Sequence, residues 1–145
     1  MPRLVDGDNL LGMWPGRDRS DAEKRELIRQ VDRLSGREGG RIVLVFDGTA
    51  PVWAAFPDVV FSGAGRSADA VILERLRRER DPRNWTVVTN DRSLADRCRA
   101  IGARVEGTKA LRIRLSAEAA AEKTGGETDV AYWLEQFGEK DPGKE

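Results

Sequence analysis

The sequence predicts an α/β protein, a three-layer α/β/α sandwich around a mostly parallel central sheet. Short apolar runs typical of buried strands recur along the chain, and RIVLVFD at 41–47 is the strongest of them. Amphipathic helical segments separate these runs, and several runs are directly followed by an aspartate. The alternation of strands and helices favours parallel strands joined by crossover helices.

The first half of the chain begins with a predicted strand at 3–6 (RLVD), followed by a loop rich in glycine and proline. A capping box that starts at Ser20 then opens a helix with apolar residues at helical spacing, and glycines from Gly36 onward end it. The run at 41–47 is apolar on both faces, as a central parallel strand requires.

The second half repeats the alternation. We expect a short strand at 59–61, a helix at 67–80, a strand at 85–89, a helix from Asp91 to Gly102, and a last strand at 103–106. The predicted order is therefore β-α-β-(β)-α-β-α-β.

Charge divides the chain into a basic body and an acidic tail. Residues 1–115 carry 22 Lys+Arg against 17 Asp+Glu, whereas residues 116–145 carry 3 against 8. We expect 1–115 to form one domain, and 116–145 to be a tail with a polar linker at 123–127 and a short amphipathic helix at 128–138. That helix either packs on the body or docks on a partner. A basic, arginine-rich body suggests a polyanionic partner, although surface ion pairing explains the charge equally well.

Composition excludes several classes of enzyme. The chain has no histidine, which rules out a Ser-His-Asp triad, a Cys-His pair, a His-ligated zinc and histidine-based RNA cleavage. Its single cysteine, Cys98, lies among apolar residues and is expected in the core. The sequence has neither an apolar run of about 20 residues nor a signal segment, which predicts a cytoplasmic protein that does not enter a membrane.

Four aspartates lie where strands end or helices begin: Asp6, Asp47, Asp69 and Asp91. Singly, each has a structural explanation as a turn residue, a helix cap or a partner of the helix dipole. In a parallel sheet, however, all four would meet at the carboxyl edge, where such folds bind ligands. Their repulsion would require a divalent cation, and an all-oxygen site suits Mg²⁺ or Mn²⁺.

Four stretches, LVDGDNL, LVFDG, SADAVILERL and TVVTNDRSLADRCRAIGARV, together resemble the YacP-like branch of the NYN domains, which are relatives of the PIN-domain nucleases. The resemblance covers about residues 3–115. It implies a PIN-like fold and a metal-dependent endoribonuclease that cleaves single-stranded RNA, in a bacterial setting linked to ribosomes or mRNA decay.

The resemblance assigns roles to individual residues. Asp6, Asp69 and Asp91 match the family's metal-binding acids, and Asp47 matches the acid that closes the second core strand. Asn9 matches the asparagine of the first motif. On this basis Asp6, Asp69 and Asp91 would hold one or two Mg²⁺ or Mn²⁺ ions, with Asp47 as a direct or water-mediated ligand.

Further residues near the same edge are candidates for supporting roles. Those that could orient the carboxylates or a water are Asn9, Ser67 and Asn90. Those that could contact RNA are Arg66, Arg92, Arg97 and Trp14. Surface solvation of the arginines and core packing of the aromatic residues, Trp53 and Phe56 included, are the alternatives.

Asp8 departs from the family, which usually has an aromatic residue at this position, and its role stays open. Asp6-Gly-Asp8 is also the DxD signature of haloacid-dehalogenase-type phosphohydrolases, with Asp6 as nucleophile and Asp8 as acid. That class expects a lysine before its last acidic pair, and the candidate Lys109 follows Asp91 instead.

Two other readings stay open at this point. A non-catalytic RNA-binding module would keep the fold and the basic body. A receiver domain would use Asp47 as its phosphoacceptor, but the pattern between 69 and 91 has no place in such a domain.

Overall fold

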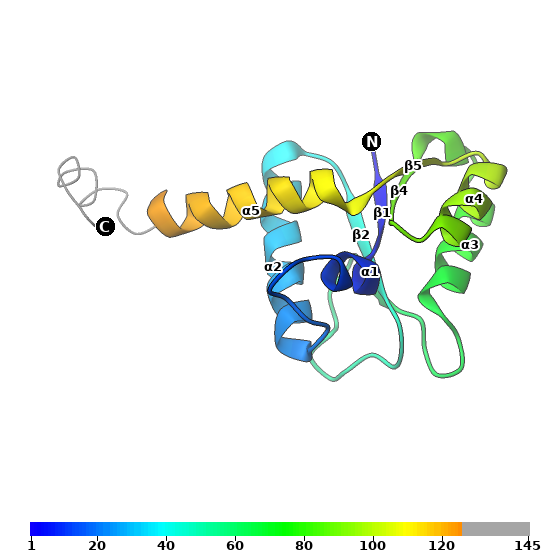
Figure 1. Cartoon of the computed structure of the whole chain (residues 1–145). Coiled ribbons are helices and arrows are strands. Elements are labelled where there is room, and N and C mark those ends of the chain that lie inside the picture. The colour runs from blue at the N-terminus through cyan, green and yellow to red at the C-terminus, as the bar shows by residue number, and fades with distance from the viewer. Residues whose placement is uncertain (126–145) are drawn as a thin grey trace.

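The computed structural model describes residues 1–125 and contains a five-stranded sheet in the order β3-β2-β1-β4-β5 (Figure 1). The strands are β1 (Arg3–Asp6), β2 (Ile42–Phe46), β3 (Val59–Phe61), β4 (Thr86–Val88) and β5 (Arg104–Glu106). Every pairing between them is parallel. This confirms the predicted α/β class. The strand order also differs from the 2-1-3-4-5 order of receiver domains, which excludes that reading.

Helices cover both faces of the sheet. They are α1 (Gly7–Gly12), α2 (Asp21–Glu38), α3 (Ala68–Arg78), α4 (Arg92–Ile101) and α5 (Thr108–Gly125), with a short 3-10 turn, η1 (Pro82–Asn84). Helices α3 and α4 lie on one face, and α1, α2 and α5 lie on the other (Figure 1). The three layers of the predicted sandwich are thus present.

Alternation along the strands builds two hydrophobic cores. In β1, Leu4 packs toward α3 and α4, whereas its neighbour Val5 packs toward α1, α2 and α5. In β2, Val43 and Val45 contribute to the first core, and the residues between and beside them contribute to the second. Because side chains alternate across a strand, a continuous apolar run is needed wherever both faces are covered.

Helix α2 begins at its predicted cap, but it runs through Gly36 and ends only at Gly39. The Ser20 hydroxyl accepts the Glu23 backbone N–H at 3.3 Å, which caps the start of the helix. Gly39 ends it with φ at 79°, a left-handed conformation that glycine adopts without steric cost.

Helix α1 corrects the prediction that a loop follows the first strand. Its Leu10 and Leu11 are fully buried, so tertiary packing holds a six-residue helix that its glycine-flanked sequence does not suggest. Gly7 is required at its start, because a Cβ at this position would lie 2.5 Å from Cε1 of Phe46.

Helix α5 spans the end of the predicted body and the start of the predicted tail. It runs through the expected boundary between 115 and 116, and it includes the first residues of the expected linker. Leu111 and Leu115 are fully buried, and the buried Glu118 carboxylate pairs with Arg37 at 2.6 Å. The predicted helix at 128–138 lies outside the described residues. None of the described helices is long and apolar enough to cross a membrane.

Candidate active site at the carboxyl edge of the sheet

Asp6 is the last residue of the central strand, and its side chain is 5% exposed. Its Oδ2 accepts the Thr89 hydroxyl at 3.0 Å. Burial raises the pKa of the Asp6 carboxyl from its ordinary value of 3.8 to about 6, and repulsion from Asp69 and Asp47 adds to the shift. The hydrogen bond from Thr89 opposes it. A buried carboxylate therefore faces other carboxylates, and no cation of residues 1–125 is among the causes of its pKa shift.

Asp69 lies in the first turn of α3, two residues after the Ser67 cap. Burial raises the pKa of its carboxyl, and repulsion from Asp91 and Asp47 raises it further, whereas Arg97 lowers it. The carboxylate of Asp69 thus interacts with acids that follow two different strands. The sequence prediction that these acids gather at one edge agrees with this coupling.

Asp91 caps the start of α4. Its Oδ1 accepts the Leu94 N–H at 3.2 Å, and its own N–H donates to the Thr89 hydroxyl at 3.0 Å. The Thr89 hydroxyl therefore connects the backbone of Asp91 to the carboxylate of Asp6. Thr89 was not among the predicted site residues, although its place in the motif TND, directly after β4, was a signal for such a role.

Asp47 follows β2 and is held at both its backbone and its side chain. Its Oδ1 accepts the Ala68 N–H at 2.6 Å, at the start of α3. Its own N–H donates to Oδ2 of Asp8 at 2.7 Å. Asp8 is largely buried, and its other oxygen lies 3.9 Å from the ammonium of Lys24. These contacts answer the open question about Asp8: it fixes the position of Asp47 and, through Asp47, the start of the helix that carries Asp69.

This engagement of Asp8 also bears on the DxD reading. A general acid of a phosphohydrolase must reach the substrate, but both oxygens of Asp8 face chain partners. The geometry therefore disfavours that alternative.

The carboxylate oxygens at this edge are of the type that binds a hard dication, but the side chains do not surround a single position. Within residues 1–125, no three histidine, cysteine, aspartate or glutamate side chains are close enough together to hold a metal ion. Asp47 and Asp91 each give one oxygen to a backbone amide, which leaves the second oxygen of each for a ligand. The coupled acids at this edge are all oxygen donors, the type that Mg²⁺ and Mn²⁺ prefer.

The three predicted supporting residues have distinct positions. Asn9 accepts the Asn90 N–H at 2.8 Å and so ties α1 to the end of β4. The Asn90 side chain turns toward α5, where it exchanges two hydrogen bonds of 3.0 Å with Thr108. Ser67 accepts the Ala70 N–H at 3.1 Å and caps α3. All three fix the segments that carry the acids, and neither Asn90 nor Ser67 is bonded to a carboxylate in the structure.

The predicted RNA contacts also differ from one another. Arg66 pairs with Glu74 at 2.9 Å, whereas Arg97 acts electrostatically on Asp69, and Arg92 is exposed at the start of α4. Trp14 is half-buried against the second core, and the guanidinium of Arg17 lies 4.3 Å from its ring centroid.

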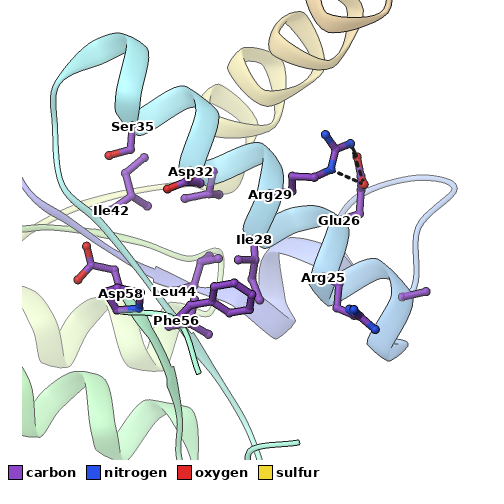
Figure 2. A pocket seen from close by; sticks show the side chains of 14 residues that line it. Arg25, Glu26, Ile28, Arg29, Asp32, Ser35, Ile42, Leu44, Phe56 and Asp58 are labelled. Atoms are coloured by element: carbon purple, nitrogen blue, oxygen red, sulfur yellow. Dashed lines mark hydrogen bonds and ion pairs between the residues drawn. The ribbon is translucent and has the colours of Figure 1, made fainter. Parts of the chain in front are cut away.

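Trp53 and Phe56 lie on the other side of α2 from Trp14. Trp53 packs against the second core and edge-on to Phe61, whereas Phe56 is 46% exposed. Phe56 lines a hollow of about 680 Å³ between α2, β2 and the segment that leads into β3. Figure 2 shows Ile28 and Leu44 in this hollow and the ion pair between Glu26 and Arg29 at its rim. None of the coupled aspartates lines the hollow.

Comparison with known proteins agrees with this fold. The family model of the YacP-like NYN domain matches residues 3–131. A crystal structure of Rae1 (YacP) from Bacillus subtilis superimposes with a TM-score of 0.70 and 18% identity, covering 94% of this chain and 88% of that chain. Its W164L mutant also gives 0.70, with 20% identity and coverage of 90% and 84%. At these identities the two structures establish the shared fold. No curated protein matches.

Proposed function

This chain belongs to the YacP-like NYN domain family, a branch of the PIN-like nucleases, and on that premise we propose that it is a metal-dependent endoribonuclease acting on single-stranded RNA. The observation that carries the proposal is the coupling of four carboxylates at the carboxyl edge of the sheet. The uncompensated charge there supports a dication as cofactor. The setting we propose is mRNA decay or ribosome-associated RNA processing in the cytoplasm.

The residues of this chain divide the work. Asp6, Asp69 and Asp91 would hold Mg²⁺ or Mn²⁺, with Asp47 as a direct or water-mediated ligand. When bound, the metal activates a water and offsets charge on the phosphate. Asp8 fixes the position of Asp47 through a backbone hydrogen bond.

Three other polar residues hold the segments that carry these acids. Thr89 links the strand of Asp6 to the helix cap of Asp91. Asn9 and Ser67 fix the neighbouring segments. In this assignment they orient the carboxylates without touching the RNA.

Two groups of residues are candidates for RNA contact. Arg92 and Arg97 lie on the first turns of α4, beside the acids, and could bind the phosphates that flank the cleaved bond. The half-buried ring of Trp14 offers a surface on which an unpaired base could stack. Arg66 contributes only if RNA displaces its exposed partner Glu74.

The direct test is Asp69→Ala, assayed by internal cleavage of single-stranded RNA with Mn²⁺. The turnover should fall by more than the roughly 100-fold that loss of an outer-shell partner costs. The thermal midpoint should stay near that of the wild type, because Asp69 is only partly buried and its carboxylate accepts no hydrogen bond from the described residues. Asp96→Ala is the matched control, because it removes an exposed carboxylate from α4.

Retained cleavage in Asp69→Ala, or equal losses in both variants, would refute the assignment. A non-catalytic RNA-binding module is the second candidate, because no three acids converge on a metal position within residues 1–125. That module would bind RNA equally well with EDTA and cleave under no divalent ion.

A further inference from the structure

The arginines of this protein differ in whether the chain itself supplies them with acidic partners. On the face of α2 and α5, ion pairs join Arg17 to Glu23 and Arg37 to Glu118. At the far end of the opposite face, Arg77, Arg80 and Arg104 are exposed, and their guanidinium groups form no ion pair or hydrogen bond with any residue that the structure describes.

The topology explains why unpaired arginines gather there. Helices α3 and α4 run antiparallel to the strands, so both end at the amino edge of the sheet, opposite the aspartates. The 3-10 turn η1 and the start of β5 lie at the same edge (Figure 1). A Cβ at Gly102, which caps α4, would lie 3.7 Å from Cγ of Arg83 in η1. The end of α4 therefore lies next to η1 at this edge.

We call this surface the arginine edge and define it by five exposed residues: Arg77, Arg80, Arg83, Arg99 and Arg104. Its two segments carry little opposing charge. Residues 77–83 contain four arginines and two acids, and residues 99–104 contain two arginines and no acid. Arg83 and Arg99 pair with Asp81 and Asp96 at 3.3 Å and 3.5 Å, in exposed contacts that contribute little to stability.

Structural needs account for only part of this charge. Cations favour the last turn of a helix, which explains Arg77 and Arg99. A charge on an edge strand discourages aggregation, and this explains Arg104 on β5. The last-turn preference also explains Arg83 in η1, but neither reason applies to Arg80, which follows α3.

We propose that the arginine edge binds the phosphodiester backbone of RNA outside the cleaved segment. Planar guanidinium groups match the geometry of phosphate oxygens, and they are the groups that remain unpaired here. The proposal rests on the proposed function and adds that the substrate is a long or folded RNA. Helix α3, with 11 residues, separates the edge from the aspartates by about 16 Å, or about five nucleotides of a helical strand.

The test compares two triple variants that remove the same charge. Arg77→Gln/Arg80→Gln/Arg104→Gln removes the three unpaired arginines, and Arg25→Gln/Arg29→Gln/Arg33→Gln removes three from α2. Binding of an RNA of about 30 nucleotides is measured in EDTA over a range of salt concentrations. Cleavage of an RNA of about six nucleotides is measured with Mn²⁺.

The edge variant should bind the long RNA on the order of 100-fold more weakly at 0.1 M salt. The plot of the logarithm of the binding constant against the logarithm of the salt concentration should become shallower, with a slope smaller in magnitude by about 2. Its cleavage of the short RNA should match that of the wild type, because the aspartates are untouched. The α2 variant should change little in either assay.

Equal affinity of the edge variant and the wild type would overturn the proposal, and so would equal losses in the two triple variants. A wild type that binds no long RNA would overturn it as well. Because the binding assay needs no catalysis, these results are separate from the nuclease assignment, which fails if the wild type cleaves neither RNA.

Discussion

Replacing Asp6 by asparagine tests the electrostatics of the site without relying on catalysis. Burial and repulsion raise the pKa of this carboxyl to about 6 from 3.8, so the folded protein holds its proton more tightly than the unfolded chain does. The stability that goes with this proton is fully present below pH 3.8. It is lost as pH rises through about 6, so the ionised carboxylate destabilises the metal-free fold at neutral pH.

The magnitude follows from the pKa shift. At about 1.4 kcal/mol per pKa unit, ionised Asp6 costs the fold about 3 kcal/mol above pH 6. Asparagine keeps an oxygen that can accept the Thr89 hydroxyl, but its amide needs a partner of its own at a cost of about 1 kcal/mol. We therefore expect Asp6→Asn to be more stable than the wild type by about 2 kcal/mol at pH 8, or about 5–8 °C in thermal midpoint.

The assay is thermal and urea unfolding in EDTA from pH 4 to pH 8, with Asp96→Asn as an exposed control. The stabilising effect of Asp6→Asn should vanish near pH 4, where both side chains are neutral. It should also shrink when Mn²⁺ is added, because the cation stabilises only the carboxylate. A variant that is no more stable than the wild type at pH 8 in EDTA would show that the site carries no uncompensated charge.

Three other substitutions or modifications test separate parts of the account. Asp8→Ala should lower the free energy of unfolding by about 1.5–3 kcal/mol and reduce turnover, because the Asp47 N–H loses a charged acceptor. Asp8→Asn keeps an acceptor and should recover part of the stability and part of the turnover. Equal effects of the two variants would contradict this role. Gly7→Ala should cost about 1–3 kcal/mol in urea unfolding, since its Cβ would press on the Phe46 ring; an unchanged midpoint would contradict that packing. Cys98 is buried, and the pKa of its thiol is raised to about 11. At pH 8 a thiol reagent should therefore modify it more than about 200-fold more slowly than free cysteine. Fast labelling of the native protein would contradict its place in the core.

The layers of the fold were predictable because they follow from apolar patterning. A strand that is covered on both faces needs a continuous apolar run, and β2 has one in IVLVF. Helix α1 was not predictable in the same way. Its sequence, GDNLLG, favours a turn locally, and it becomes helical because Leu10 and Leu11 are buried beneath α2 and α5.

The location of the site was predictable, but its hydrogen bonds were not. Parallel topology alone brings Asp6, Asp47 and Asp91 to the same edge, since they follow the neighbouring strands β1, β2 and β4. Loop conformation decides which carboxylate oxygen of each aspartate accepts a hydrogen bond from a backbone amide. The apolar periodicity of the sequence does not specify loop conformation. The buried contact from Asp8 to the Asp47 amide spans 39 residues of sequence and is of this kind.

The acidic partners of the arginines could likewise not be predicted from the sequence. Arg66 and Arg97 have the same residue type and lie near the same edge, yet one pairs with Glu74 and the other acts on Asp69. Arg66 precedes α3 and pairs with a residue on that helix, whereas Arg97 lies on α4.

A crystal soaked in Mn²⁺ would show directly whether the aspartates hold a cation. We expect an anomalous density peak at the carboxyl edge of the sheet, within ligand distance of Asp6, Asp69 and Asp91, and no such peak in a crystal of Asp69→Ala. Well-ordered carboxylates at that edge with no anomalous peak between them, at a Mn²⁺ concentration that supports RNA cleavage, would contradict it.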